Sequence, residues 1–157
     1  MKRMTIVAAA VLGLIVALGS APANAAVAGD GDLDPQVAAM LDEVPGGIVI
    51  DATHAVWPEL AMELSVRPES GVTARSVGSC ATDKICAYSG VSLSGSVLTF
   101  GTCGILSVPA SFSVKSAANA RSSGYAQPRN GTTVLTTINA GGWGNVSGTT
   151  TNIRCVL

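Results

Sequence analysis

The second half of the chain consists of short apolar segments separated by glycines, and this spacing restricts the fold more than any other feature. Five segments from residue 71 onward are rich in β-branched or aromatic residues, which favour strands. They are residues 85–88, 97–100, 112–114, 133–138 and 152–156. Several short strands at this spacing, with Ser and Thr at exposed positions, predict an all-β sandwich or barrel.

A short helix is expected before the strands begin. Asp34 can cap a helix whose first residue is Pro35, because an aspartate accepts from unpaired N–H groups and the fixed φ of proline suits that position. Apolar residues then recur at i, i+3 and i+4 from Val37, which is one face of a helix. The Pro-Gly-Gly run at 45–47 ends it.

Between this helix and residue 71 the pattern changes to β. Residues 48–50 form a β-branched run, and residues 60–66 alternate apolar with polar side chains, which predicts a strand with one buried face. The apolar positions of that strand are Leu60, Met62, Leu64 and Val66. Trp57, just before it, is expected to lie in or over the core.

The beginning of the chain has the three-part layout of an export signal. Lys2 and Arg3 precede an uncharged apolar run at 4–18, and Ala23 and Ala25 supply the small residues that a signal peptidase requires. The run is about 15 residues, short of the roughly 20 that span a bilayer, so we expect no stable membrane anchor. We expect residues 1–25 to be a cleaved signal peptide and the protein to be secreted and extracellular.

Cysteine usage agrees with export. The chain has four cysteines, an even number that predicts two disulfides in a secreted protein. They are Cys80, Cys86, Cys103 and Cys155. Three pairings are possible, and we expect Cys80 with Cys86, which closes a short loop, and Cys103 with Cys155, which ties the middle of the module to its last strand. Zinc is the competing interpretation, but no Cys-x-x-Cys pair is present and the single histidine lies far upstream.

Charge is unevenly distributed although the formal net charge is only −1. Nine acids and one base lie between residues 30 and 69, whereas six bases and one acid follow residue 71. The acidic part can simply pack against the basic part, or the basic part can meet an acidic partner. A nucleic-acid partner is not expected, because the chain has no basic run.

Few residues could carry catalysis. His54 is the single imidazole, and no nucleophile motif accompanies it. Glu59, Glu63 and Glu69 could supply the paired carboxylates of a glycosidase, although Glu63 falls on the polar face of an alternating strand. A hydrolase would need these groups to converge in a cleft. We expect a protein that is not an enzyme, with no catalytic residues, no cofactor and no metal.

Residues 80–88 (Cys-Ala-Thr-Asp-Lys-Ile-Cys-Ala-Tyr) and 95–100 (Gly-Ser-Val-Leu-Thr-Phe) resemble the opening of the secreted actinobacterial metalloproteinase-inhibitor family. Members of that family have a βγ-crystallin-like fold, in which an aromatic residue, a second aromatic and a glycine form a tight hairpin folded over the sheet. Here Tyr88, Leu93 and Gly95 occupy those positions, with leucine in place of the second aromatic. The similarity runs from about residue 45 to 157.

The resemblance implies an all-β, βγ-crystallin-like Greek-key sandwich with a short N-terminal helix and extension. The chain would then be divided into a linker and short helix at 26–44, a β extension packed on the module at 45–71, and a disulfide-braced domain at 72–157. Crystallin-type calcium sites carry acids before a Ser/Thr-Ser pair. The corresponding places near Phe112 and Val146 lack them, so no calcium is expected.

The resemblance also implies a monomeric inhibitor that presents a rigid loop to an extracellular protease, with a metalloproteinase as target. Thermolysin-like enzymes favour an apolar residue just after the cleaved bond. Gly104, Ile105 and Leu106 follow a cysteine and meet that demand, so they form the candidate inhibitory loop. The alternative is that Ile105 and Leu106 are core residues of a strand running to Val108.

A secreted non-catalytic binding or structural module is the alternative function, with a cell-wall glycan or a protein as partner. Trp143 lies in a Gly-Gly-Trp-Gly run at 141–144 and would serve as a stacking platform. An exposed Trp143 favours binding, and a buried one favours a structural role.

Overall fold

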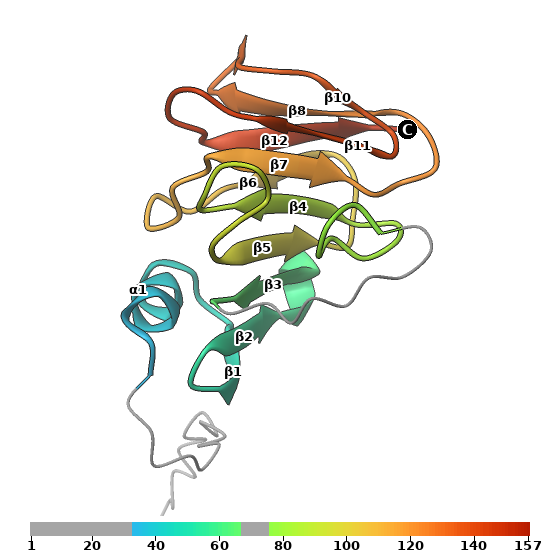
Figure 1. The fold of residues 1–157 in the computed structure, drawn as a ribbon. Coiled ribbons are helices and arrows are strands. Elements are labelled where there is room, and N and C mark those ends of the chain that lie inside the picture. The colour runs from blue at the N-terminus through green and yellow to red at the C-terminus, as the bar shows by residue number, and fades with distance from the viewer. Residues whose placement is uncertain (1–32, 67–75) are drawn as a thin grey trace, which may run out of the picture.

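The computed structural model describes residues 33–66 and 76–157. The expected signal peptide at 1–25, residues 26–32 of the expected linker and helix at 26–44, and residues 67–75 lie outside the described residues. The described part is mostly strand, with one helix, α1 (Pro35–Glu43), and one 3-10 turn, η1 (Pro58–Leu60) (Figure 1). This confirms the all-β expectation. None of the helical segments described is long and apolar enough to cross a membrane.

The strands form two antiparallel sheets. The first sheet has the order β1-β2-β3-β5-β4-β7-β11, and the second has the order β10-β8-β12-β6, with β9 paired to β8. The first contains β1 (Ile48–Asp51), β2 (His54–Trp57), β3 (Met62–Ser65), β4 (Ile85–Tyr88), β5 (Val97–Phe100), β7 (Ser116–Asn119) and β11 (Gly142–Asn145). The second contains β6 (Ile105–Ser107), β8 (Tyr125–Asn130), β9 (Thr133–Val134), β10 (Ile138–Asn139) and β12 (Asn152–Val156).

Two sets of four strands share one arrangement. In the first set, β5, β4 and β7 are neighbours in the first sheet while β6 joins the second sheet beside β12. In the second set, β10, β8 and β12 are neighbours in the second sheet while β11 joins the first sheet beside β7. In each set, the third strand in chain order therefore joins the sheet of the other set: β6 in the first and β11 in the second. Neither sheet is complete without both halves of the sequence.

The main core lies on the inner side of the first sheet and continues to the second. A row of paired positions crosses β3, β5, β4 and β7 and points inward, because residues opposite each other in a ladder share a face. The row consists of Leu64, Leu98, Ala87 and Ala117, each fully buried. Leu106, Ile153 and Ala126 join the same cluster from the second sheet.

A smaller apolar cluster lies on the other side of β4. It contains Cys86, Tyr88 and Ala118 from the sheet and Cys80 from the segment that precedes β4. The disulfide between Cys80 and Cys86 holds that segment against the strand. Burial raises the pKa of the Tyr88 phenol, whose oxygen lies 3.1 Å from the Ser79 hydroxyl.

The second disulfide joins Cys103, just before β6, to Cys155 in β12. Both bridges are the pairs favoured in the sequence analysis, and the described residues contain no free cysteine. Two disulfides fit an oxidising compartment.

The hairpin between β4 and β5 folds back tightly over the sheet. Ser92 and Leu93 adopt positive φ, and Gly95 has φ of 78° where an added Cβ would lie 2.4 Å from the Ser89 hydroxyl. Buried Ser116 holds the hairpin down, because its Oγ accepts from the Leu93 N–H and donates to the Gly90 carbonyl. Only glycine fits at position 95 without moving its neighbours.

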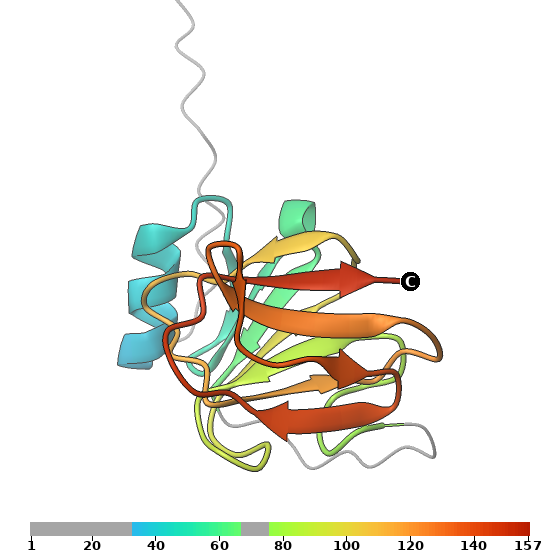
Figure 2. The same ribbon diagram turned by 90° about the horizontal axis from the view of Figure 1, so that it is seen from above.

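The N-terminal segment extends the first sheet through the pairing of β3 with β5. Helix α1 begins as expected, with the Asp34 carboxylate accepting from the Gln36 N–H at 2.9 Å. Its buried Val37 and Met40 face the main core, and Trp57 donates from Nε1 to the Val44 carbonyl. Figures 1 and 2 both show α1 at the side of the strands and not between the sheets.

Three strand expectations were wrong. Leu60 lies in η1 with 50% exposure and does not continue the buried face of β3. Residues 112–114 turn instead of pairing, because the Phe112 N–H donates to the Pro109 carbonyl, although Phe112 and Val114 are buried. The expected strand at 133–138 is divided into β9 and β10.

Removing either disulfide by paired Cys→Ser substitution is expected to lower the free energy of unfolding. The bridges span 52 and 6 residues. Loop-closure entropy therefore predicts a loss of about 4 kcal/mol for Cys103–Cys155 and about 2 kcal/mol for Cys80–Cys86, as upper figures. Urea unfolding of the two double variants measures both losses. An equal loss for the two would contradict the loop-length account.

The contact between α1 and the loop after β6 is expected to weaken in acid. Hydrogen bonds from Ser111, and then from the Ala110 N–H, lower the pKa of the Glu43 carboxylate. A lowered folded-state pKa contributes stability that is present above the unfolded pKa and is lost as the pH falls through the folded value.

Thermal unfolding of Glu43→Gln should therefore occur at a lower temperature than that of the wild type near neutral pH. The difference should narrow as the pH falls through the lowered folded-state pKa of Glu43, because the wild-type carboxylate then also becomes neutral. Glu59→Gln, at an exposed position on η1, is the matched control. A constant difference across this pH range would contradict the role of the Glu43 charge.

Candidate functional site

The candidate inhibitory segment lies at the outer edge of the second sheet. Ile105 begins β6 with 65% of its surface exposed, whereas the next residue, Leu106, is buried in the main core. Gly104 is exposed, has φ of 131°, and has no atom within 4 Å of where a Cβ would stand. The two interpretations of this segment therefore apply to different residues: Leu106 is core, and Ile105 faces solvent.

Strand β6 is paired on one side only within the described residues. Its partner is β12, with Leu106 opposite Ile153 and Ile105 opposite Arg154. The Cys155 N–H donates to the Gly104 carbonyl at 2.7 Å, and the Cys103–Cys155 disulfide fixes the start of the segment. The segment is thus an extended, braced strand whose second edge is open.

The outer face beside Ile105 is polar and basic. The row that contains Ile105 continues through Arg154 on β12 to Gln127 on β8. Arg129, two residues further along β8, donates from Nη2 to the Gln127 side chain, and its Nε has no partner among the described residues. No acidic residue occurs in β6, β8 or β12. No carboxylate of the second sheet therefore balances the guanidinium charges of Arg129 and Arg154 on this face.

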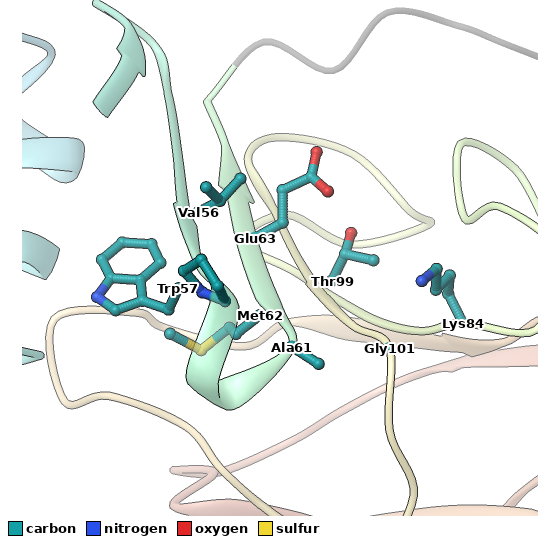
Figure 3. A pocket seen from close by; sticks show the side chains of 9 residues that line it. Val56, Trp57, Ala61, Met62, Glu63, Lys84, Thr99 and Gly101 are labelled. Atoms are coloured by element: carbon teal, nitrogen blue, oxygen red, sulfur yellow. The ribbon is translucent and has the colours of Figure 1, made fainter. Parts of the chain in front are cut away.

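Of the residues considered for a hydrolase, the structure brings His54 and Glu63 together. His54 Nε2 and Glu63 Oε1 are 2.8 Å apart, across the β2–β3 pair. Glu63 also lines a hollow of about 200 Å³ with Lys84 and Thr99. Figure 3 shows these three side chains on one side of β3 and the indole of Trp57 on the other. Glu59 is not among the residues that line the hollow, and Glu69 lies outside the described residues.

This arrangement resembles a cross-strand ion pair more than a catalytic centre. The side chains of His54 and Glu63 are 28% and 48% exposed, so water screens their interaction. Glu63 is the one carboxylate among the described residues that line the hollow, whereas glycoside hydrolysis uses two. The pair is best explained as a link between β2 and β3.

The described residues contain no group of three or more His, Cys, Asp or Glu side chains placed to hold a metal ion. All four cysteines form the two disulfides, so no thiol is left to bind a metal.

Trp143 lies on β11, at the other edge of the first sheet from β1, and pairs with Ala118. It is 50% exposed, which is the condition that favours a binding role over a structural one. Its position on a strand, and not in a turn, comes from the β7–β11 pairing.

The sequence pointed to Ile105 and Trp143 but not to the residues that lie beside them in the fold. The basic character after residue 71 was visible, yet nothing in the sequence places Arg154 beside Ile105, because the pairing of β6 with β12 joins segments about fifty residues apart. No family model, no curated protein and no solved structure matches this chain.

Truncating the two apolar residues of β6 should separate their roles. Leu106→Ala is expected to lower the free energy of unfolding by about 2–4 kcal/mol, because it leaves a cavity in the core. Ile105→Ala should change it by less than about 0.5 kcal/mol, because that side chain is mostly in water. Urea unfolding measures both values. A large loss for Ile105→Ala would mean that Ile105 is a structural residue and not a free one.

Proposed function

We propose that this protein is a secreted peptidase inhibitor of metalloproteinases that presents the backbone of the segment Gly104, Ile105 and Leu106 to the cleft of the enzyme, with Ile105 as the side chain that enters it. The observation that carries the proposal is the exposure of Ile105 at the open edge of a strand that a disulfide holds extended. The sequence resemblance to a secreted metalloproteinase-inhibitor family points in the same direction.

The open edge suits recognition by strand addition. An extended segment with an unpaired backbone edge can join a sheet of its partner, with main-chain hydrogen bonds giving affinity and side-chain pockets giving specificity. Ile105 would fill the pocket that receives the apolar residue after the cleaved bond, and Leu106 would stay anchored in the core. Because pairing with β12 and the disulfide already restrict the segment, binding costs little conformational entropy.

The charge of the surrounding face supports a partner with an acidic rim. Arg154 is exposed and lies directly opposite Ile105. Arg129 on β8 lies diagonally across from Arg154. Complementary charge around an interface raises the association rate more than it raises affinity. The acidic residues at 33–66 that the structure describes lie on or beside α1, η1 and the strands of the first sheet, so none of them belongs to this face.

For the fold, we propose a βγ-crystallin-like pair of Greek keys. The exchange of β6 and β11 between the sheets supports this, since each four-strand unit places three strands in one sheet and one in the other. The hairpin of Tyr88, Leu93 and Gly95 also supports it, with its positive φ at the last two positions. Export through a cleaved signal at 1–25 is part of the same proposal, and the two disulfides fit it.

Substituting the exposed apolar residue should strongly weaken inhibition. Ile105→Asp places a charge where an apolar pocket is expected, so the inhibition constant against a thermolysin-type protease should rise about 100-fold, as for a hot-spot residue. Val91→Asp, at another exposed apolar position on the β4–β5 hairpin, is the matched control and should leave inhibition unchanged. The inhibition constant is measured with a peptide substrate on the secreted protein.

Circular dichroism must show that both variants remain folded. Equal inhibition by wild type and Ile105→Asp would remove this segment as the inhibitory one. Absence of inhibition by the wild type itself, across metalloproteinases of different cleft specificity, would overturn the proposed function.

A secreted glycan-binding module is the second candidate function, and the exposure of Trp143 favours it. A half-exposed indole on a strand, with a glycine on either side of it, suits stacking against a sugar ring.

A further inference from the structure

A second hollow, of about 620 Å³, lies where the segment before β4 passes the ends of β7 and β11. Its volume falls within the usual range for small-ligand sites. The residues with polar side chains that line it come from two separate parts of the chain, 76–83 and 121–122. They are Ser76, Thr82, Asp83, Arg121 and Ser122.

Apart from Ser76, these side chains offer both donors and acceptors to a ligand. The hollow contains three hydroxyl groups, one carboxylate and one guanidinium. Asp83 and Arg121 do not form an ion pair with each other, as judged from the described residues. Arg121 donates from Nη2 to the Gly101 carbonyl at 3.2 Å, while its buried Nε has no hydrogen-bond partner within the described part of the chain. A buried donor without a partner is costly, which favours a ligand or water that accepts from it.

Trp143 lies on β11, the strand that begins directly after a residue lining this hollow. Ala118 and Ala120 belong to the same apolar cluster on the outer side of the first sheet. Ala120 lines the hollow, and Ala118 is the strand partner of Trp143. Gly141, which also lines the hollow, directly precedes β11 and is two residues before Trp143. An exposed aromatic residue therefore follows closely on a cavity that is rich in hydroxyls and balanced in charge.

We infer that this hollow, together with Trp143, is an oligosaccharide-binding site. The apolar face of a sugar ring would stack on the Trp143 indole, and the hydroxyl groups of the next ring would bind in the hollow. Asp83 would accept from paired hydroxyls, and Arg121 would donate to them. A neutral sugar fits best, because the two charges in the site are opposite. The inference rests on the second candidate function and names the site and the ligand class for it.

The test titrates the secreted protein with N-acetylchitohexaose and, separately, with cellohexaose, while tryptophan fluorescence and heat are recorded. The chain has two tryptophans, and Trp57 is 1% exposed, so a change on binding reports on Trp143. We expect at least one sugar to quench the fluorescence. Trp143→Ala should weaken binding at least about 10-fold, and Asp83→Asn and Arg121→Gln should each weaken it about 10-fold, the loss of one good hydrogen bond.

Asp83 is exposed and has φ of 64°, a conformation that asparagine also tolerates, so Asp83→Asn keeps the test available if Arg121→Gln fails to fold. Val134→Asp, at an exposed position of β9 in the second sheet, is the control and should bind sugar as the wild type does. If neither sugar binds, both the inference and the second candidate function fail. If Trp143→Ala abolishes binding while Asp83→Asn does not alter it, a glycan binds at Trp143 but the inference about the hollow is wrong.

Discussion

The pairing of β6 with β12 is the interaction on which the rest of the structure depends. It takes a strand from the first half of the module into the sheet of the second half, and the Cys103–Cys155 disulfide holds it there. One alternation of side chains then sends Leu106 into the core and Ile105 outward. Stability and the proposed inhibitory edge therefore arise from the same register, and a slip of one residue would exchange the two side chains.

The N-terminal segment completes the first sheet and separates the charges of the molecule. β3 covers the edge of β5 that would otherwise be open. The Glu43 carboxylate links α1 to the loop after β6 by accepting from the Ala110 and Ser111 N–H groups. This places most of the acids at one end, whereas Arg129 and Arg154 remain on the second sheet. A molecule with such polarity can orient an acidic partner towards the face that carries Ile105.

Where local pattern decided the structure, the sequence predicted it well. The strands β4, β5 and β12 occupy the expected residues, and α1 has its expected cap. β7 was missed because its sequence, Ser-Ala-Ala-Asn, has no bulky apolar residue, yet all four residues are buried between neighbours. β11, with the sequence Gly-Trp-Gly-Asn, was missed for a related reason, because its strand conformation comes from pairing with β7 and not from propensity.

The sequence by itself determined that this chain is a strand-rich protein with a capped helix and two sulfur cross-links, because periodicity, capping residues and cysteine number are local or countable properties. Only the tertiary structure decided which residues come together: Arg154 lies beside Ile105, and Gly141, two residues before Trp143, lines the hollow of Asp83 and Arg121. The physical reason is that a ladder aligns residues by register between strands far apart in the chain, and no short stretch of sequence encodes its distant partner.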